Sequence, residues 1–333
     1  MRNMATATIP VTEDEHFAVL DSLAREFEEA FAELAESAER ELFGRAFVFS
    51  SYGRELYPYF EETDADLVPG CIVPIKEGRP VASVDSTCVL VGETSQGALY
   101  AARTAVGMSV EGSLRRFFRL GPILVYATAS GLSGLAPGLP STELDLILSD
   151  HAVAERFIRN TVERRVLDAL AGAGEGAILM ADGSLKHPLG QLSAPALRRA
   201  GADNSIVGFS KSSNLILSEA VVGVISRAEG PSFYALHKGP ISTVLAKFTR
   251  DGLVFRLDLA GPEPPETTLG RIIWNDAFAS GYPDSLKVAH HLSIFSKAED
   301  QALKAFVAKR FRVRQLHTFP LRKIALGSFR GGA

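Results

Sequence analysis

The sequence predicts an α/β protein in which helices flank a mixed β-sheet. Residues 13–43 repeat apolar side chains at three- and four-residue steps, which is typical of a helix. From residue 81 to 129 the apolar pattern takes the period of strands. Beyond residue 143, helical and strand-like segments alternate. Early strands suited to antiparallel pairing, followed by this alternation, indicate one mixed sheet covered by helices.

The N-terminal segment predicts one long amphipathic helix. Its apolar stripe, with acids between its members, consists of Phe17, Leu20, Leu23, Phe27, Phe31 and Leu34. Such a stripe covers a core or forms a dimer contact, and the sequence fits both. A loop-rich stretch follows from residue 50 to 80.

The next segments predict strands. Residues 81–92 suggest strand, turn and strand around Asp85, and residues 98–108 and 123–129 suggest two further strands. Between them lies SLRRFFRL, residues 113–120, which fits an amphipathic strand or a helix.

The second half of the chain predicts helices and strands in alternation. A helix is expected over 143–171, ended by glycines, and two helices at 285–295 and 299–311 close the chain. Residues 195–200 fit a short helix. The predicted strands are 178–182, 206–209, 232–236, 244–248 and 253–259.

Composition excludes several classes of protein. The net charge of −4 gives no global signal for nucleic acid, so any basic surface must be local. Cys71 and Cys88 form neither a disulfide framework nor a zinc spacing, and no secretory signal is seen, which predicts a cytoplasmic protein. Residues 121–142 lack charge but contain Gly and Pro, so no membrane span is expected. No glycine-rich nucleotide loop follows a predicted strand.

Two predicted strand ends carry an acid beside small hydroxyl residues. These are Asp85 in VASVDSTCV and Asp182 in AILMADGSL. Asp-Gly is a common turn pair, so a turn explains each acid taken alone. Two such acids at one sheet edge would repel unless a divalent cation bound between them.

The helix predicted at 143–171 supplies further acids. Glu155 and Glu163 are the candidates, and Glu163 lies about two turns before the helix ends. A strand returning from there to Asp182 would bring Glu163 toward the sheet. A solvated helix face, with Arg159 four residues earlier, explains Glu163 equally well.

A third feature is the segment GYPDSLKVAHH. Pro283 fits the first turn of a helix, so Tyr282 stands at the helix entrance. His290 falls in an apolar stripe, where a histidine is usually a hydrogen-bonded core residue. Next to an acidic cluster, its neutral imidazole becomes a candidate metal ligand.

Taken together, these segments resemble the NurA nuclease family. The resemblance spans roughly residues 80–295, in matching order and spacing, and its most specific parts are the ADGSL and GYP…AHH segments. It implies a ribonuclease H-like fold, manganese-dependent DNA cleavage with 5′–3′ exonuclease and single-strand endonuclease activity, a homodimer, and partnership with a HerA-type hexameric translocase in DNA end resection. The residues themselves fix no polarity of digestion.

The resemblance also implies the roles of individual residues. Asp85, Glu163, Asp182 and His290 resemble the metal ligands, Tyr282 the aromatic hydroxyl near the scissile phosphate, and Lys211 the lysine after a short strand. Where the family has Asp-Gly-Ser, this chain has Ser86 and Thr87 after Asp85, which predicts an altered turn and an altered direction of that carboxylate. His291, next to His290, is the alternative ligand.

The expected domains follow from the same resemblance. They are an N-terminal helical and loop extension (1–75), a ribonuclease H-like nuclease domain (76–300), and a basic C-terminal helix and tail (301–333). Three carboxylates and one imidazole suit Mg²⁺ or Mn²⁺, and the nitrogen favours Mn²⁺. Asp85, on the central strand, would bridge two such ions.

Local basic segments are the candidates for DNA binding. In SLRRFFRL, arginines next to phenylalanines suit backbone contact and base stacking, although solvated arginines on an amphipathic element fit as well. No acid follows Asp300. The predicted DNA-binding residues are Arg115, Arg116, Arg119, Lys309, Arg310, Arg312 and Arg314.

Two other functions remain open on the sequence. One is a catalytically weak subunit that regulates a DNA translocase, which gains support if Ser86 misplaces Asp85. The other is an ATP-using α/β enzyme, which would need a second glycine-rich phosphate turn that the sequence lacks.

Overall fold

The computed structural model describes most of the chain. The described residues are 13–43, 46–49, 61–62, 69–135, 138–174, 176–185, 204–210, 215–216, 225–237 and 239–316. Lys211 and the short helix predicted at 195–200 lie outside them.

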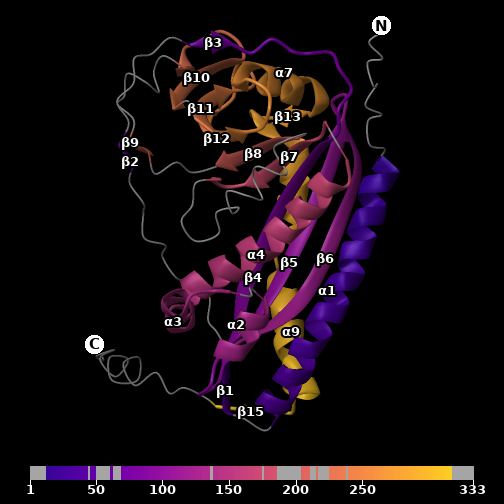
Figure 1. Cartoon of the computed structure of the whole chain (residues 1–333), viewed down its shortest axis with the longest axis vertical. Coiled ribbons are helices and arrows are strands. Elements are labelled where there is room, and N and C mark those ends of the chain that lie inside the picture. Colours follow the sequence, from indigo (N-terminus) through magenta and orange to yellow (C-terminus); the bar gives the residue numbers. More distant parts are fainter. Residues whose placement is uncertain are drawn as a thin grey trace, which may run out of the picture.

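The described elements are helices and strands in mixed order (Figure 1). The helices are α1 (Glu13–Leu42), α2 (Ala129–Leu135), α3 (Ser141–Ser149), α4 (His151–Gly172), α7 (Pro265–Asn275), α8 (Asp284–Ser293) and α9 (Lys297–Arg310). The strands are β1 (Ala46–Phe49), β2 (Glu61–Glu62), β3 (Gly70–Cys71), β4 (Val81–Glu93), β5 (Ala98–Val110), β6 (Ser113–Ala127), β7 (Ile178–Asp182), β8 (Ser205–Ser210), β9 (Leu215–Ile216), β10 (Ser232–His237), β11 (Ser242–Lys247), β12 (Val254–Ala260), β13 (Phe278–Ala279), β14 (Tyr282–Pro283) and β15 (Arg314–Gln315).

Strand β4 is the centre of the main sheet. It pairs antiparallel with β5, which pairs antiparallel with β6, and on its other side it pairs parallel with β7, which pairs parallel with β8. Helix α4 lies in the chain between β6 and β7. Three antiparallel strands followed by two strands parallel to the first form the ribonuclease H-like arrangement. The predicted fold class, a mixed sheet flanked by helices, is confirmed.

The sheet continues past β8 as an antiparallel extension. Strand β12 pairs with β8, and β11, β10 and β3 follow in that order. In Figure 1 this extension lies with α7 at the upper end of the long strands β4, β5 and β6.

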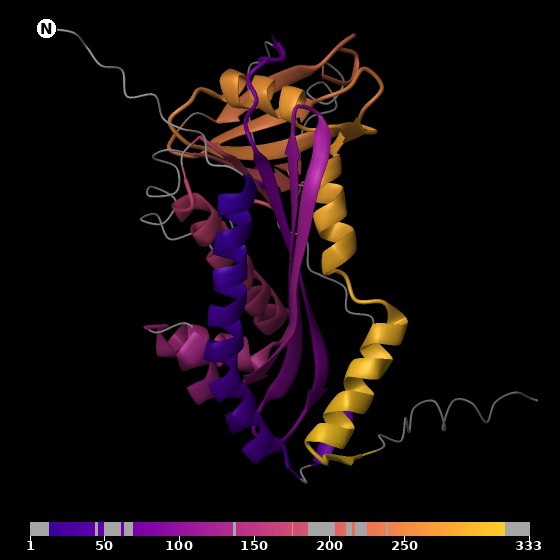
Figure 2. The same ribbon diagram turned by 90° about the vertical axis from the view of Figure 1, so that its right-hand side faces the viewer.

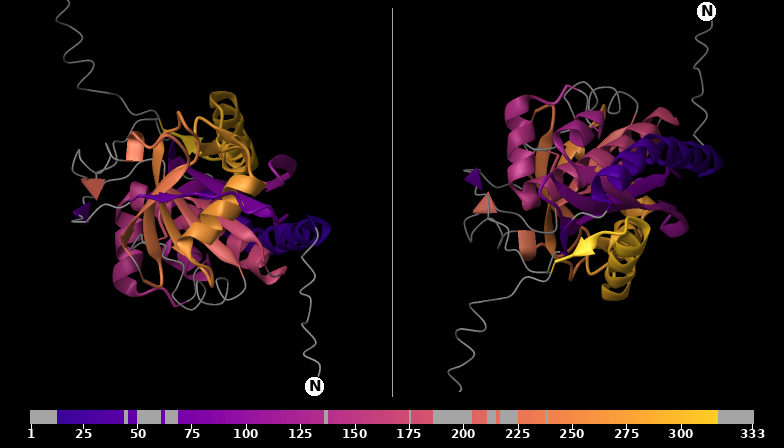
Figure 3. Two further views of the ribbon diagram at one scale, coloured as in Figure 1. Left: turned by 90° about the horizontal axis from the view of Figure 1, so that it is seen from above. Right: turned by 90° about the horizontal axis from the view of Figure 1, so that it is seen from below.

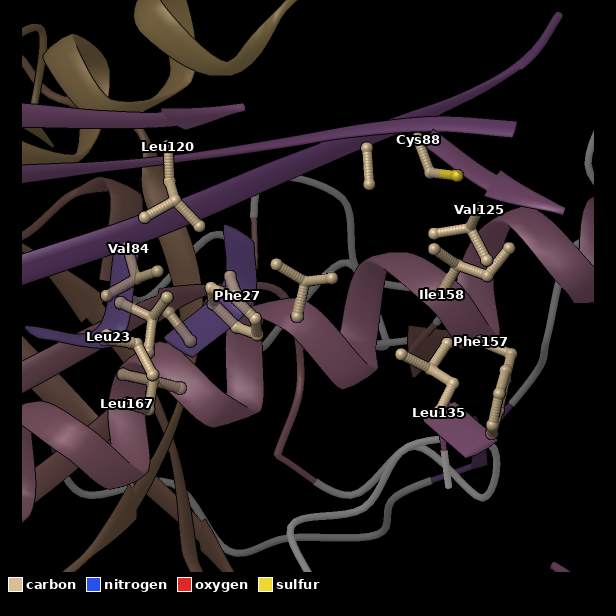
Figure 4. Packing of buried hydrophobic residues seen from close by; sticks show 14 of the residues in the cluster. Leu23, Phe27, Val84, Cys88, Leu120, Val125, Leu135, Phe157, Ile158 and Leu167 are labelled. Atoms are coloured by element: carbon tan, nitrogen blue, oxygen red, sulfur yellow. The ribbon is translucent and has the colours of Figure 1, made fainter. Parts of the chain in front are cut away.

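Helices cover both faces of the long strands. Figure 2 shows α1 on one side and α8 and α9 on the other, and Figure 3 shows the same layers end-on. Successive side chains of β4 point to opposite faces of the sheet. Val84 and Cys88 join the core cluster with α1 and α4 (Figure 4), whereas Ser83 hydrogen-bonds to Ser285 of α8. Odd-numbered residues in this part of β4 therefore face α8.

Helix α8 lies unusually close to β5. A Cβ atom at Gly107 would stand 2.2 Å from the carbonyl oxygen of Ser285, a distance that no packed structure allows. The Oγ atoms of Ser83 and Ser285 are 2.5 Å apart, and Ser285 Oγ also donates to buried Asp276. The start of α8 is thus fixed against the sheet by shape and by hydrogen bonds.

Two predicted elements differ from the structure near the centre of the sheet. Asp85 does not end a strand, because β5 pairs with β4 from Val81 to Glu93 and keeps it extended. SLRRFFRL belongs to the single strand β6, which also contains the strand predicted at 123–129. Long cross-strand pairing overrides the local turn signal at Asp85.

Two helical predictions also change. The helix expected over 143–171 is two helices, since Asp150 caps α4 by accepting from the backbone N–H of Ala152 at 2.7 Å. Helix α7 was not predicted, although Pro265 at its start is a common signal. The long N-terminal helix agrees with α1.

Replacing Gly107 with alanine tests the close contact of α8. The new methyl group would force Ser285 away from β5, so we expect Gly107→Ala to lower the free energy of unfolding by about 1–3 kcal/mol. Chemical denaturation measures this decrease. Gly172→Ala is the control, because a Cβ there meets nothing within 4 Å and should leave stability unchanged or slightly higher. Equal stability of the two variants would contradict the contact.

Candidate metal centre

Two carboxylates lie side by side where β7 ends. Val84 of β4 is in register with Ala181 of β7, so the next residues, Asp85 and Asp182, occupy neighbouring positions on parallel strands. β7 ends at Asp182, while β4 continues. Asp85 is buried and Asp182 is partly exposed. The acid pair thus has one buried and one accessible member.

Helix α8 brings an imidazole to this pair. His290 Nδ1 lies 2.7 Å from Asp85 Oδ2, and Ser293 Oγ donates to the same oxygen at 3.2 Å. The backbone N–H of Ser86 donates to Asp85 Oδ1 at 2.8 Å. These partners fix the direction of the Asp85 carboxylate.

Asp85, Asp182 and His290 have the geometry of a metal site. One ligand atom from each lies within 4.8 Å of the others. Ligands bound at about 2.1 Å from one ion stand up to about 4.2 Å apart, so small side-chain adjustments suffice. Two carboxylates and one imidazole are donors that suit Mn²⁺ or Mg²⁺. The donor set therefore fits the predicted cofactor.

Glu163 approaches the acids from the opposite face of the sheet. Burial raises its pKa well above the ordinary value, and the charges of Asp85 and Asp182 add to that rise, while Arg159 opposes it. The neighbouring Ser86 side chain also lowers the pKa of Glu163. Glu163 is thus close enough to interact with both acids, but it is not part of the three-residue group.

The alternative helical acid, Glu155, has a structural contact. Its Oε1 accepts from the backbone N–H of Leu90 at 3.0 Å, next to the bulge in β4 between Leu90 and Gly92. Glu155 thus takes part in the backbone hydrogen bonding of β4.

Tyr282 places a hydroxyl near the acids. Its ring packs edge-on against Phe209, with centroids 5.2 Å apart, and against Phe255 at 5.6 Å. Burial raises the pKa of Tyr282 above its usual value, and the charges of Asp182 and Asp85 raise it further. Tyr282 therefore stays protonated at neutral pH and is able to donate a hydrogen bond.

The Ser86-Thr87 departure does not turn Asp85 away. The predicted change of turn is wrong, because Asp85 lies within a strand. Ser86 Oγ lies 2.8 Å from Thr104 Oγ1, and Thr87 Oγ1 lies 3.3 Å from Ser293 Oγ. Both hydroxyls join the hydrogen-bond network around the acids.

Of the two adjacent histidines, His290 is the one that faces Asp85. His291 is exposed. Ser293 was not predicted, although it lies three residues after His290 and so shares its helix face. Arg103 was also missed; it donates to the Ile294 carbonyl at 3.0 Å and to Glu299 at 2.8 Å, and it holds the end of α8. A buried arginine among small residues of β5 was the available signal.

The predicted basic residues lie in two places. Arg115, Arg116 and Arg119 are exposed on β6, Phe117 is 59% exposed, and Arg116 also stands 5.0 Å from the ring centre of Phe17. Lys309 and Arg310 end α9, and Arg310 pairs with Glu39 at 2.7 Å. Arg312 and Arg314 follow, also exposed.

Comparison with known proteins gives structural similarity but no sequence match. No protein-family model matches the chain, and no curated protein matches its sequence. The NurA nuclease from Sulfolobus solfataricus is similar with a TM-score of 0.44 and 12% identity, over 88% of this chain and 94% of that one. A NurA structure bound to dAMP and manganese gives 0.45 and 11%, over 92% and 99%. An endonuclease V from Bacillus subtilis gives 0.38 and 10%, over 72% and 87%.

Among the residues that the structure describes, none of the helices has the length and apolar character to span a membrane.

The buried carboxyl of Asp276, at the C-terminus of α7, makes stability depend on pH. Burial raises the pKa of Asp276 from 3.8 to about 6, against hydrogen bonds from Ser285 that lower it. The folded state therefore holds this proton more tightly than the unfolded state. The free energy of unfolding should fall by up to about 3 kcal/mol as pH rises from about 4 to 6.

Asp276→Asn removes this titration with little change of shape. We expect the variant to lack this contribution to the slope of stability against pH, measured by denaturation at several pH values between 4 and 7. A slope equal to that of the unsubstituted protein would show that Asp276 does not carry the effect.

Proposed function

We propose that the protein is a divalent-metal-dependent deoxyribonuclease. The observation that carries this proposal is the convergence of Asp85, Asp182 and His290 from two parallel strands and a distant helix. Glu163 places a third carboxyl group close to Asp85 and Asp182. Neighbouring carboxylates such as Asp85 and Asp182 repel each other unless a cation is bound, so the arrangement favours a metal-binding role.

The site would act on a phosphodiester. A bound Mn²⁺ or Mg²⁺ supplies an activated water and positive charge for the phosphorus centre. Asp85 and Asp182 would hold the cation, with His290 as the nitrogen ligand that favours Mn²⁺. The protonated Tyr282 hydroxyl would donate to the phosphate or orient the water, and Lys211 would neutralise a non-bridging oxygen.

DNA as the substrate is supported by the basic residues near the sheet. Exposed Arg115, Arg116 and Arg119 on β6 suit phosphate contacts, and exposed Phe117 suits stacking with a base. Lys309, Arg310, Arg312 and Arg314 would form a second contact for DNA or for a protein partner.

The finer parts of the proposal come from the sequence resemblance to NurA nucleases. They are 5′–3′ exonuclease and single-strand endonuclease activity, a homodimer, and action with a HerA-type hexameric translocase in DNA end resection. The rival proposal, a catalytically weak regulatory subunit, would gain support from a misplaced Asp85. The contact between Asp85 and His290 removes that support.

Neutralising either acid tests the metal site. We expect Asp85→Asn and Asp182→Asn to lower Mn²⁺-dependent DNA degradation at least about 100-fold, since each removes a charged ligand. Degradation of labelled single- and double-stranded DNA, with and without Mn²⁺, measures the effect. Asp251→Asn is the control, because Asp251 is exposed in a turn. Full activity of both site variants would refute the assignment.

Neutralising the arginines of β6 tests the DNA surface. Replacing Arg115 and Arg119 with glutamine should weaken DNA binding. It should also make the plot of log affinity against log salt concentration less steep, by about 0.9 for each phosphate of duplex DNA that is no longer neutralised. Fluorescence anisotropy at several salt concentrations measures the slope. Arg164→Gln on α4 is the control. An unchanged slope in the β6 variant would count against this surface.

A further inference from the structure

A second buried acid lies close to the metal site without belonging to it. Asp258 of β12 is fully buried, and four groups contact its carboxylate. Oδ2 accepts from Ser184 Oγ at 2.5 Å and from the Leu185 backbone N–H at 3.1 Å. Oδ1 accepts from Thr243 Oγ1 at 2.9 Å and from Arg256 at 3.4 Å. Oδ2 therefore binds the turn after Asp182, and Oδ1 binds side chains of β11 and β12 in the sheet extension.

The turn after Asp182 is pressed onto β8. Gly183 has a φ of +116°, which favours glycine, and its N–H donates to the Phe209 carbonyl at 2.8 Å. A Cβ at Gly208 would stand 2.7 Å from the Gly183 carbonyl oxygen. Gly208 is also the residue in register with Asp258. The lack of a side chain at Gly208 thus lets the turn cross β8 and reach the Asp258 carboxylate.

We infer that Asp258 is a positioning residue for the metal site, acting through Ser184 and Leu185 on Asp182. This inference rests on the proposed function. The carboxylate anchors the chain within two residues of Asp182 and so fixes the end of β7. Each residue of the Asp-Gly-Ser motif then has its own task. Asp182 would hold the cation, Gly183 makes the turn, and Ser184 donates a hydrogen bond to Asp258.

The four hydrogen bonds to Asp258 explain why a carboxylate, and not a neutral side chain, occupies this fully buried position. A carboxylate accepts several hydrogen bonds at once, and bonds to a charged acceptor are stronger than those between neutral groups. Arg256, from the same strand, partly neutralises it. The antiparallel extension β10 to β12 therefore does more than pack the core, because Asp258 of β12 holds the turn that positions Asp182 of β7.

Two matched variants separate positioning from general stability. Ser184→Ala removes the hydroxyl that donates to Oδ2 in the turn, and Thr243→Val removes the hydroxyl that donates to Oδ1 on β11. Each removes one hydrogen bond to the same carboxylate, so both should lower the free energy of unfolding by a similar amount in chemical denaturation. Only Ser184→Ala should loosen the turn beside Asp182.

The decisive measurement is Mn²⁺ binding without DNA, by isothermal titration calorimetry. We expect the dissociation constant for Mn²⁺ to rise about tenfold in Ser184→Ala, as for other residues that orient metal ligands, and to stay unchanged in Thr243→Val. In the nuclease assay, the Mn²⁺ concentration for half-maximal rate should rise in Ser184→Ala. The rate at saturating Mn²⁺ should recover.

Three outcomes would overturn the inference. They are unchanged Mn²⁺ binding in Ser184→Ala, equal weakening in both variants, and a rate of Ser184→Ala that saturating Mn²⁺ does not restore. The absence of Mn²⁺ binding in the unsubstituted protein would be a different result. It would refute the metal site of the proposed function, and the inference with it.

Discussion

The parallel pairing of β4 with β7 is the constraint on which the candidate site depends. Register between Val84 and Ala181 puts Asp85 and Asp182 beside each other, and a shift of one residue would turn one of them to the opposite face. Apolar side chains on both faces of β7 hold that register, since Ile178 and Met180 join one core cluster and Leu179 another. Core packing thus sets the distance between two acids that repel each other.

The second requirement is that α8 is held rigidly. His290 is remote from Asp85 in the chain, so only the packing of α8 keeps the two side chains together. Its start is held by Gly107, Ser285 and Asp276, and its end by Ser293 and Arg103. The helix is short, so contacts at both ends leave the imidazole little freedom to move. Two neighbouring strands, β4 and β5, supply most of these contacts, and the same strands carry or support Asp85. The candidate ligands therefore share one framework, which is what a preorganised metal site would need.

Much of the fold was predictable, because long periodic segments carry strong signals. The strands around residues 98–108 and 206–209 and the helix over 13–43 agree with β5, β8 and α1. The turn predicted at Asp85 is wrong. Small hydroxyl residues suggest a loop locally, but pairing with β5 keeps this part of β4 extended. Asp182 and His290 were found through their motifs. Asp258 carried no signal, since its partners come together only when β8, β11 and β12 align.

Strand β6 pairs only with β5 among the described residues, so its outer edge presents backbone donors and acceptors. An edge of this length is a template on which another chain can add a strand and start aggregation. Charged side chains and proline discourage such pairing, and β6 carries both, with Arg115 and Arg119 exposed and Pro122 lacking an N–H. The arginines proposed to contact DNA would thus also discourage the addition of a further strand at this edge. One set of side chains would then serve two purposes, DNA binding and protection of the strand edge.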